Sequence, residues 1–172
     1  MKNTKNYIFT AMFASLILMG TSFMPIPTFN GYIHIGDALI YLCCAFLPLP
    51  FSLLAAGIGA SLADLIGGYA QFIPFTFVVK ALMTIFFSNK SEKILSRKNA
   101  VALIFAGLVN IVGYYIAEMI LYGQDTFAKT LIVSASSIPG NIIQSVGSSV
   151  IFVVVAFALD KIDFKKNIRN IK

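Results

Sequence analysis

Long apolar segments, separated by short polar connections, dominate this sequence. Between Lys5 and Lys90 only three residues carry a charge, and most other charges lie at the two ends and in the connections. Of the 172 residues, 58% are apolar and 12% are charged, whereas a soluble domain has about 25% charged residues. Because so few charges cannot cover a soluble surface, the sequence predicts an integral membrane protein and excludes a soluble enzyme or a disordered chain.

Turn-forming residues divide the apolar sequence into six segments. Proline pairs end the first two segments, and the Gly67-Gly68 pair ends the third. The segments are longer than the strands of a membrane barrel and do not alternate as those strands do. The sequence therefore predicts an all-α membrane protein, a bundle of six transmembrane helices that forms a single integral membrane domain over residues 1–172. The expected spans are 7–24, 33–47, 51–66, 72–87, 100–122 and 130–159, and the Pro139-Gly140 pair is a candidate break in the last one.

Positively charged residues indicate the side of the membrane that the ends occupy. Six spans place both termini on one side, together with the connection formed by residues 88–99. That side carries eleven Lys and Arg residues, whereas the opposite side carries only Lys129. Because cytoplasmic loops are enriched in Lys and Arg, both termini of this multi-pass cell-membrane protein are predicted to be cytoplasmic. The net charge of +6 then reflects orientation in the membrane rather than nucleic-acid binding.

Four ionisable residues lie inside apolar segments, where an unpaired charge costs several kcal/mol. The predicted topology places Asp37, Asp64 and Glu118 near the outer ends of their spans. Lys80 lies near the middle of its span. Either Asp37 or Asp64 could pair with Lys80 and join two helices, whereas Glu118 could face a pocket or meet water at the membrane surface.

Uncharged polar residues gather in the same outer half. Asn110, Tyr114 and Glu118 share one face of the fifth segment, and the spacing of Asn141 and Gln144 is that of one face of the sixth. The face on the sixth segment is equally compatible with helix packing. Amide, carboxylate and aromatic groups together suit a small, polar, ring-shaped ligand. The predicted substrate-binding residues are Asn30, Tyr32, His34, Tyr69, Gln71, Asn110, Tyr114, Glu118, Asn141 and Gln144.

The sequence has no motif of a known type of catalytic site. It contains no G-x-x-x-x-G-K-[ST], no G-x-S-x-G and no H-E-x-x-H, and its single His34 has no cysteine or carboxylate pattern around it. We therefore expect no catalytic residue, no cofactor and no metal site. A transporter without its own ATPase motif draws its energy either from an ion gradient or from a partner ATPase.

The part of the chain from Gly31 to Lys80 carries a recognisable pattern. It contains His34-x-Gly36-Asp37, then a helix rich in small residues that ends in Leu-Ala-Asp64, and then Lys80-Ala-Leu-Met. This pattern resembles the substrate-binding S components of energy-coupling factor (ECF) transporters, in particular the riboflavin-type branch. The resemblance implies a subunit that captures a small water-soluble vitamin or heterocyclic precursor from outside. Its partners would be a membrane scaffold subunit and two cytoplasmic ATPases.

The resemblance also implies roles for individual residues. Asp37, Asp64 and Lys80 belong to the recurring pattern of the family, so we expect structural or gating roles for these charges. Small residues of the first helix would dock on the scaffold, and here they are Ala11, Ala14 and Ser15. A queuosine precursor, pyridoxine, a thiamine pyrimidine and riboflavin all remain candidate substrates. The first alternative is a stand-alone ion-coupled secondary transporter that uses its intramembrane carboxylates. The second alternative is a membrane assembly factor.

Overall fold

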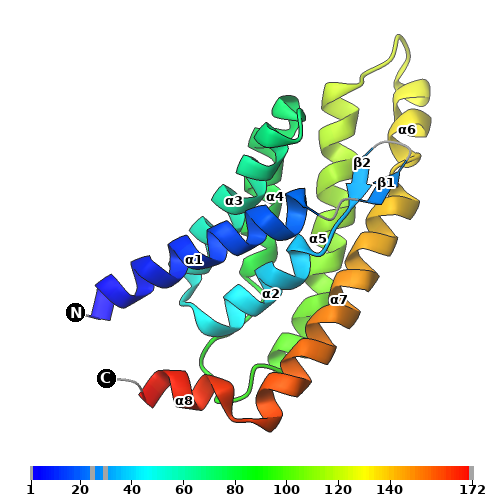
Figure 1. Ribbon diagram of the computed structural model, residues 1–172. Helices are drawn as coiled ribbons and strands as arrows, with labels where there is room; N and C mark the ends of the chain where they lie inside the picture. Colours follow the sequence, from blue (N-terminus) through cyan, green and yellow to red (C-terminus); the bar gives the residue numbers. More distant parts are fainter. Residues whose placement is uncertain (1, 24–25, 29–30, 171–172) are drawn as a thin grey trace.

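Helices make up most of the chain, and one short hairpin follows the first helix (Figure 1). The computed structural model describes residues 2–23, 26–28 and 31–170. The elements in chain order are α1 (Lys2–Ser22), β1 (Ile26–Thr28), β2 (Gly31–Ile33), α2 (Gly36–Phe46), α3 (Leu49–Ile66), the short 3-10 helix η1 (Ala70–Phe72), α4 (Ile73–Thr84), α5 (Arg97–Leu121), α6 (Phe127–Ala135), α7 (Ile138–Lys161) and α8 (Phe164–Asn170).

Each of the six apolar segments contains helix, as the sequence predicts. Within the described residues, three helical stretches are long and apolar enough to cross a membrane: α3, α5 and the stretch of α6 and α7 from Phe127 to Lys161. The helices at Gly36–Phe46 and Ala70–Thr84 are apolar but shorter. The count of six crossings and the cytoplasmic position of the termini stay predictions.

The last apolar segment breaks into α6 and α7 just before the Pro139-Gly140 pair. Pro139 lies in the first turn of α7. A proline is tolerated there because the N–H group that it lacks would have no partner inside the helix. The break places Ser136 and Ser137 between two helices.

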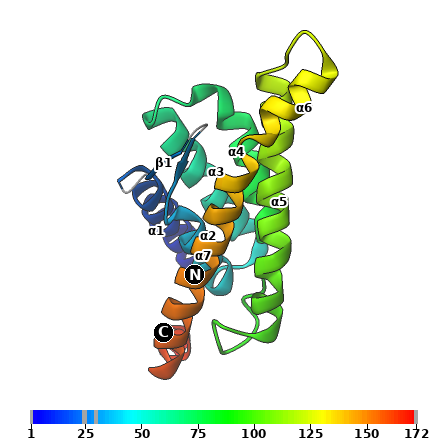
Figure 2. The ribbon, with the colours of Figure 1, turned by 90° about the vertical axis from the view of Figure 1, so that its right-hand side faces the viewer.

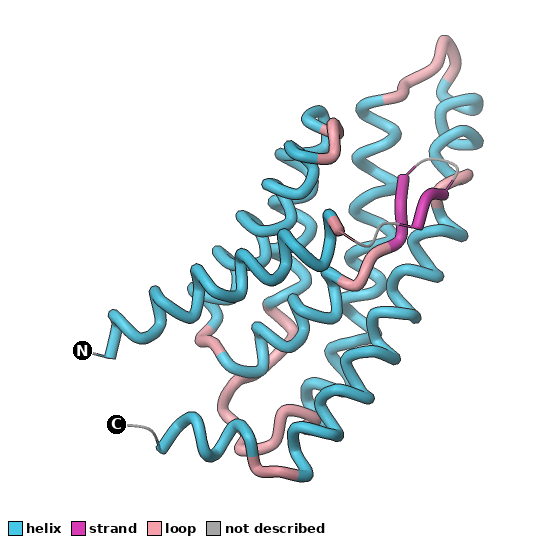
Figure 3. The backbone as a smooth tube through the Cα atoms, viewed as in Figure 1, coloured by secondary structure: helices cyan, strands magenta, loops and turns pink. Residues whose placement is uncertain are grey.

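The hairpin of β1 and β2 departs from the all-α prediction (Figure 3). The strands are antiparallel, with Ile26 opposite Ile33 and Thr28 opposite Gly31. Each strand has only three residues, which is too short for an alternating pattern to be recognised in the sequence. The hairpin leads through His34 into α2.

Helix α2 lies at the centre of the helical bundle. Nine of its eleven residues are buried, which explains why it is apolar on all sides after Asp37. Its Tyr41 ring stacks on Phe87 at a centroid distance of 5.1 Å and meets the edge of Phe152 at 5.9 Å. Helix α2 therefore anchors the core, and residues at its N-terminal end are held in a fixed position.

Helices α1 and α3 approach each other closely at Gly59. A Cβ atom at this position would lie 2.6 Å from the main-chain oxygen of Ala14 and 3.0 Å from the Cβ of Ile17. Only glycine permits this distance between the two backbones, as is common where membrane helices cross. Ala14 therefore faces α3, whereas Ala11 and Ser15 are exposed on α1.

The connection between α4 and α5 is held by the C-terminal part of the chain, at the same end of the molecule as α8 (Figure 1). The two carboxylate oxygens of Asp160 accept hydrogen bonds from the N–H groups of Ile94 at 2.7 Å and Leu95 at 2.9 Å. The ammonium of Lys165 donates to the main-chain oxygens of Asn89 at 3.0 Å and Ser91 at 2.6 Å. These contacts give an irregular, polar connection a defined structure.

We expect Asp160→Asn to loosen this connection. An amide offers one oxygen, so one of the two N–H groups loses its acceptor, and the free energy of unfolding falls by about 1–3 kcal/mol. Limited trypsin digestion measures the local effect, because Lys90 and Lys93 are exposed. The matched control is Asp163→Asn in the same exposed tail. Equal cleavage of the two variants would contradict the prediction.

Candidate functional site

A buried ion pair joins α2 to α4. The Lys80 Nζ lies 2.7 Å from the Asp37 Oδ1, and the two side chains are 2% and 0% exposed. The sequence allowed either Asp37 or Asp64 to pair with Lys80, and the structure shows that Asp37 is the partner. Asp64 is buried near the C-terminal end of α3, and its main-chain oxygen accepts a hydrogen bond from the N–H of Tyr69 at 2.8 Å.

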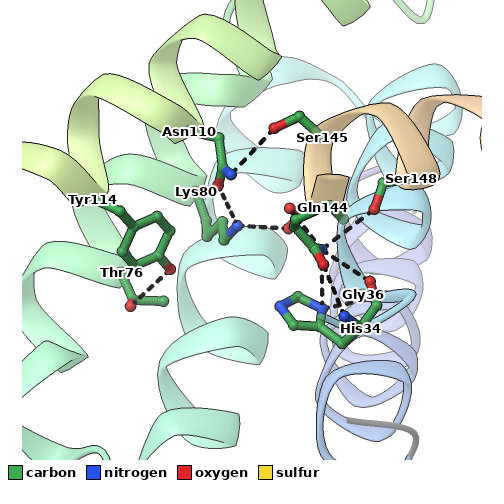
Figure 4. A network of polar contacts seen from close by, with 10 residues as sticks. His34, Gly36, Thr76, Lys80, Asn110, Tyr114, Gln144, Ser145 and Ser148 are labelled. Atoms are coloured by element: carbon green, nitrogen blue, oxygen red, sulfur yellow. Dashed lines mark hydrogen bonds and ion pairs between the residues drawn. The ribbon is translucent and has the colours of Figure 1, made fainter. Parts of the chain in front are cut away.

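The ammonium group of Lys80 extends this contact to α5 (Figure 4). It donates to the Asn110 Oδ1 at 2.7 Å and lies 5.1 Å from the centre of the Tyr114 ring, a favourable cation–π distance. The Asn110 Nδ2 in turn donates to the Ser145 Oγ of α7 at 3.3 Å. The hydroxyl of Tyr114 lies 3.0 Å from that of Thr76. One lysine therefore links four helices, either directly or through Asn110.

Gln144 of α7 ties the end of the hairpin to the same cluster (Figure 4). Its Oε1 accepts a hydrogen bond from the main-chain N–H of His34 at 2.8 Å, and its Nε2 donates to the main-chain oxygen of His34 at 2.9 Å. The Nε2 also lies 3.1 Å from the Asp37 Oδ2 and 3.3 Å from the Ser148 Oγ. The Gln144 side chain thus binds both the N–H and the oxygen of the His34 main chain, as the main chain of a neighbouring strand would in a sheet.

Further polar side chains lie near the C-terminal end of α5 and at the break between α6 and α7. Glu118 is 3% exposed, and within the described residues its Oε2 has no hydrogen-bond partner. The hydroxyl of Ser137 donates to the main-chain oxygen of Ser134 at 3.0 Å. The Asn141 Nδ2 lies 3.5 Å from the Ser137 Oγ. The hydroxyl of Ser134 is also buried, and it likewise has no hydrogen-bond partner among the described residues.

The structure brings four of the predicted site residues into two neighbouring groups. His34 and Gln144 bind each other at the end of the hairpin, and Asn110 and Tyr114 both contact Lys80. Glu118 is buried on α5, and Asn141 is half-buried on α7. Tyr69 is half-buried in the turn between α3 and α4, where its ring meets Phe72 at 6.5 Å, and Phe72 in turn lies 6.4 Å from the Tyr114 ring.

Of the other predicted residues, one is exposed, one lies in the hairpin, and one is outside the described residues. Gln71 is exposed in the same turn as Tyr69. Tyr32 lies in β2 opposite Pro27. Asn30 lies outside the residues that the structure describes. Within the described residues, no group of His, Cys, Asp and Glu side chains could hold a metal ion.

Sequence reasoning missed Thr76, Ser134 and Ser137. Thr76 lies four residues before Lys80, so helical spacing could have placed both on one face of α4. Ser134 and Ser137 carried no such signal, because Ser134 lies at the end of α6 and Ser137 lies in a helix break whose position only the structure defines. The missed residues are all hydroxyl-bearing, a residue type that is common in helix interiors without a binding role.

Comparisons with known proteins agree with this architecture. Residues 1–161 match the model of the family described as ECF-type riboflavin transporter, S component. A Pyrococcus woesei protein, described as an uncharacterized protein in the gap 3' region, is 30% identical over 101 residues, which are 58% of this chain and 68% of that protein. The solved structure of the S component of a bacterial ECF transporter is similar with a TM-score of 0.71 and 20% identity, over 93% of this chain and 98% of the other. At this identity the solved structure supports the fold alone.

Proposed function

The chain belongs to the family of ECF-type riboflavin transporter S components, and from this premise we propose that it captures a small water-soluble vitamin or heterocyclic precursor from outside the cell for ATP-driven import. The family is one of membrane-embedded, substrate-binding transporter subunits rather than enzymes. The energy would come from an ECF module made of a membrane scaffold subunit and two cytoplasmic ATPases. The exposed Ala11 and Ser15 of α1 are the candidate contact with that scaffold.

The observation that carries this proposal is the polar contact between α5 and α7, closed at one side by the hairpin. Buried polar groups in a membrane protein are costly unless they are paired or have a function. Asn110 and Gln144 bind Lys80, Ser145 and His34 and form the framework of this region. The Glu118 carboxylate and the Tyr114 ring are groups that recognise ring heteroatoms and stack on planar ligands. The arrangement supports capture of a ring-shaped molecule at the outer side.

The capture of a ligand is tested by purifying the full chain from cells and identifying released small molecules by mass spectrometry. We expect a heterocyclic compound, and we expect the same compound to raise the thermal unfolding temperature of the protein. The candidates are riboflavin, pyridoxine, the aminopyrimidine precursor of thiamine and the queuosine precursor. If no heterocycle is released and none raises the unfolding temperature, the proposal is wrong.

The energy source requires a second measurement. Vesicles that contain the chain together with scaffold and ATPase subunits should take up the ligand only when ATP is present. A stand-alone ion-coupled carrier would instead take up the ligand without these subunits and lose uptake when the ion gradient is collapsed. Uptake by this chain alone would therefore support the alternative.

A further inference from the structure

The exposed surface of α5 is an apolar stripe that begins beside a cation. Large apolar side chains recur at intervals of three or four residues, the spacing of one helical face: Val101, Ile104, Leu108, Val112, Ile116 and Ile120. At a rise of 1.5 Å per residue the stripe is about 28 Å long, close to the thickness of the hydrocarbon core of a bilayer. Arg97, one turn before Val101, is exposed and is the first residue of the helix. No charged residue lies within one turn after Ile120.

The exposed surface of α7 has the same construction. Its stripe consists of Ile143, Val146, Val150, Val154 and Phe157. The next position on this face is Lys161, which is exposed and is the last residue of the helix. The Lys161 Nζ lies 4.8 Å from the centre of the Phe157 ring, a favourable cation–π distance. Because α5 and α7 run in opposite directions (Figures 1 and 2), Arg97 and Lys161 lie at the same end of the molecule.

Helix α8 is fixed against this end of the bundle. The Phe164 ring meets the edge of the Phe46 ring of α2 at 6.2 Å. The Lys5 Nζ of α1 donates to the main-chain oxygen of Ile168 at 3.2 Å. Lys166 of α8 is exposed. The C-terminal tail is therefore part of the folded surface at this end and adds a further cation to it.

The two ends of the molecule differ in their exposed charges. Among the described residues, the end at α8 exposes six Lys and Arg side chains besides Lys5, and two carboxylates; they are Lys90, Lys93, Arg97, Lys98, Lys161 and Lys166, with Glu92 and Asp163. None of these six cations forms an ion pair within that part of the chain. The opposite end, between α5 and α6, exposes one cation and one carboxylate, Lys129 and Asp125. An excess of positive charge is thus confined to one end.

We propose that the end at α8 lies in the headgroup layer of a membrane leaflet and binds acidic phospholipids, with Arg97 and Lys161 as contacts to their phosphate groups. Each of these cations follows an apolar stripe on the same helical face, one turn beyond the last apolar side chain. That is the depth at which lipid phosphates follow the hydrocarbon core, and anionic headgroups attract Lys and Arg there. An acidic soluble protein would meet the connection between α4 and α5 and the surface of α8, and it would not require cations in line with the apolar stripes.

The test measures the unfolding temperature of the purified full chain in neutral detergent micelles with added lipid. We expect phosphatidylglycerol to raise this temperature, and phosphatidylcholine of the same chain length and inorganic phosphate to leave it unchanged. Arg97→Gln/Lys161→Gln should raise the phosphatidylglycerol concentration at half of the shift about 10- to 30-fold, since each cation near an anionic surface contributes about fivefold. Lys129→Gln, which removes the exposed cation of the opposite end, is the matched control and should respond as the wild type does.

Several outcomes would overturn the proposal. An equal shift with phosphatidylcholine would mean that the headgroup charge is not recognised, and an equal shift with inorganic phosphate would indicate a site for the free anion. A double variant that responds to phosphatidylglycerol as the wild type does, but no longer assembles with scaffold and ATPase subunits, would assign the two cations to a protein partner. Where the double variant does not fold, salt provides the test in the wild type. At about 1 M salt exposed charges are screened, so a phosphatidylglycerol effect that salt leaves unchanged would contradict the proposal.

Discussion

Lys80→Met is expected to lower the free energy of unfolding by about 3–5 kcal/mol, the largest effect of any single substitution proposed for this protein. The change removes the cation that lies 2.7 Å from the fully buried Asp37 carboxylate. It also removes the donor to the Asn110 Oδ1. Thermal and denaturant unfolding in detergent micelles would measure the loss, together with the fraction of protein that elutes as a single species.

Two further variants separate the ion pair from other effects of the substitution. In Asp37→Asn/Lys80→Met both charges are absent, so we expect this double variant to be more stable than Lys80→Met alone. Lys90→Met removes an exposed lysine outside the helices and should leave stability unchanged. Unfolding of Lys80→Met at the same temperature as Lys90→Met would show that the ion pair does not hold α2 and α4 together.

Gln144→Ala is expected to release the hairpin from α7 and to raise the dissociation constant of the substrate about 10- to 100-fold. The substitution leaves both main-chain groups of His34 without the amide that binds them at 2.8 and 2.9 Å. Each lost partner of a buried group costs about 1–3 kcal/mol, less where water can enter. Because the hairpin closes one side of the proposed site, we expect the loss to appear mainly as faster ligand dissociation.

Hydrogen exchange gives a readout that does not depend on knowing the ligand. The amides of residues 31–36 should exchange faster in Gln144→Ala than in the wild type, while those of α3 keep their rates. Gln124→Ala is the matched control, since the side chain of this exposed glutamine donates to the nearby main-chain oxygen of Tyr122 at 2.9 Å. Unchanged exchange at residues 31–36 would mean that Gln144 does not hold the hairpin.

The helical faces of the candidate site could be predicted because helix geometry is local. Residues four apart on one helix share a face, so Asn110, Tyr114 and Glu118 could be grouped from their spacing alone. The same argument grouped Asn141 with Gln144. Spacing within one helix does not define which face of another helix lies opposite. The contacts of Asn110 with Ser145, and of Gln144 with His34, therefore required the folded structure.

The roles within the site depended even more on the fold. Gln144 was predicted to read a ligand, but in the structure its amide oxygen binds the hairpin and its amide nitrogen binds the hairpin and Asp37. An amide looks the same in the sequence whether its partner is a ligand or the main chain. The hairpin itself had no usable signal, since three-residue strands are too short for a period of two to be recognised.

The sequence by itself determined that this is a helical membrane protein with a cluster of polar groups in its apolar segments. These properties follow from composition and from periodicity along the chain, which depend only on residue types and on spacing within one segment. The tertiary structure decided that Lys80 pairs with Asp37 rather than Asp64, that Gln144 holds the hairpin, and that Glu118 keeps a carboxylate oxygen with no partner among the described residues. Each of these depends on a distance between residues far apart in the chain, and such distances are set only when the helices pack.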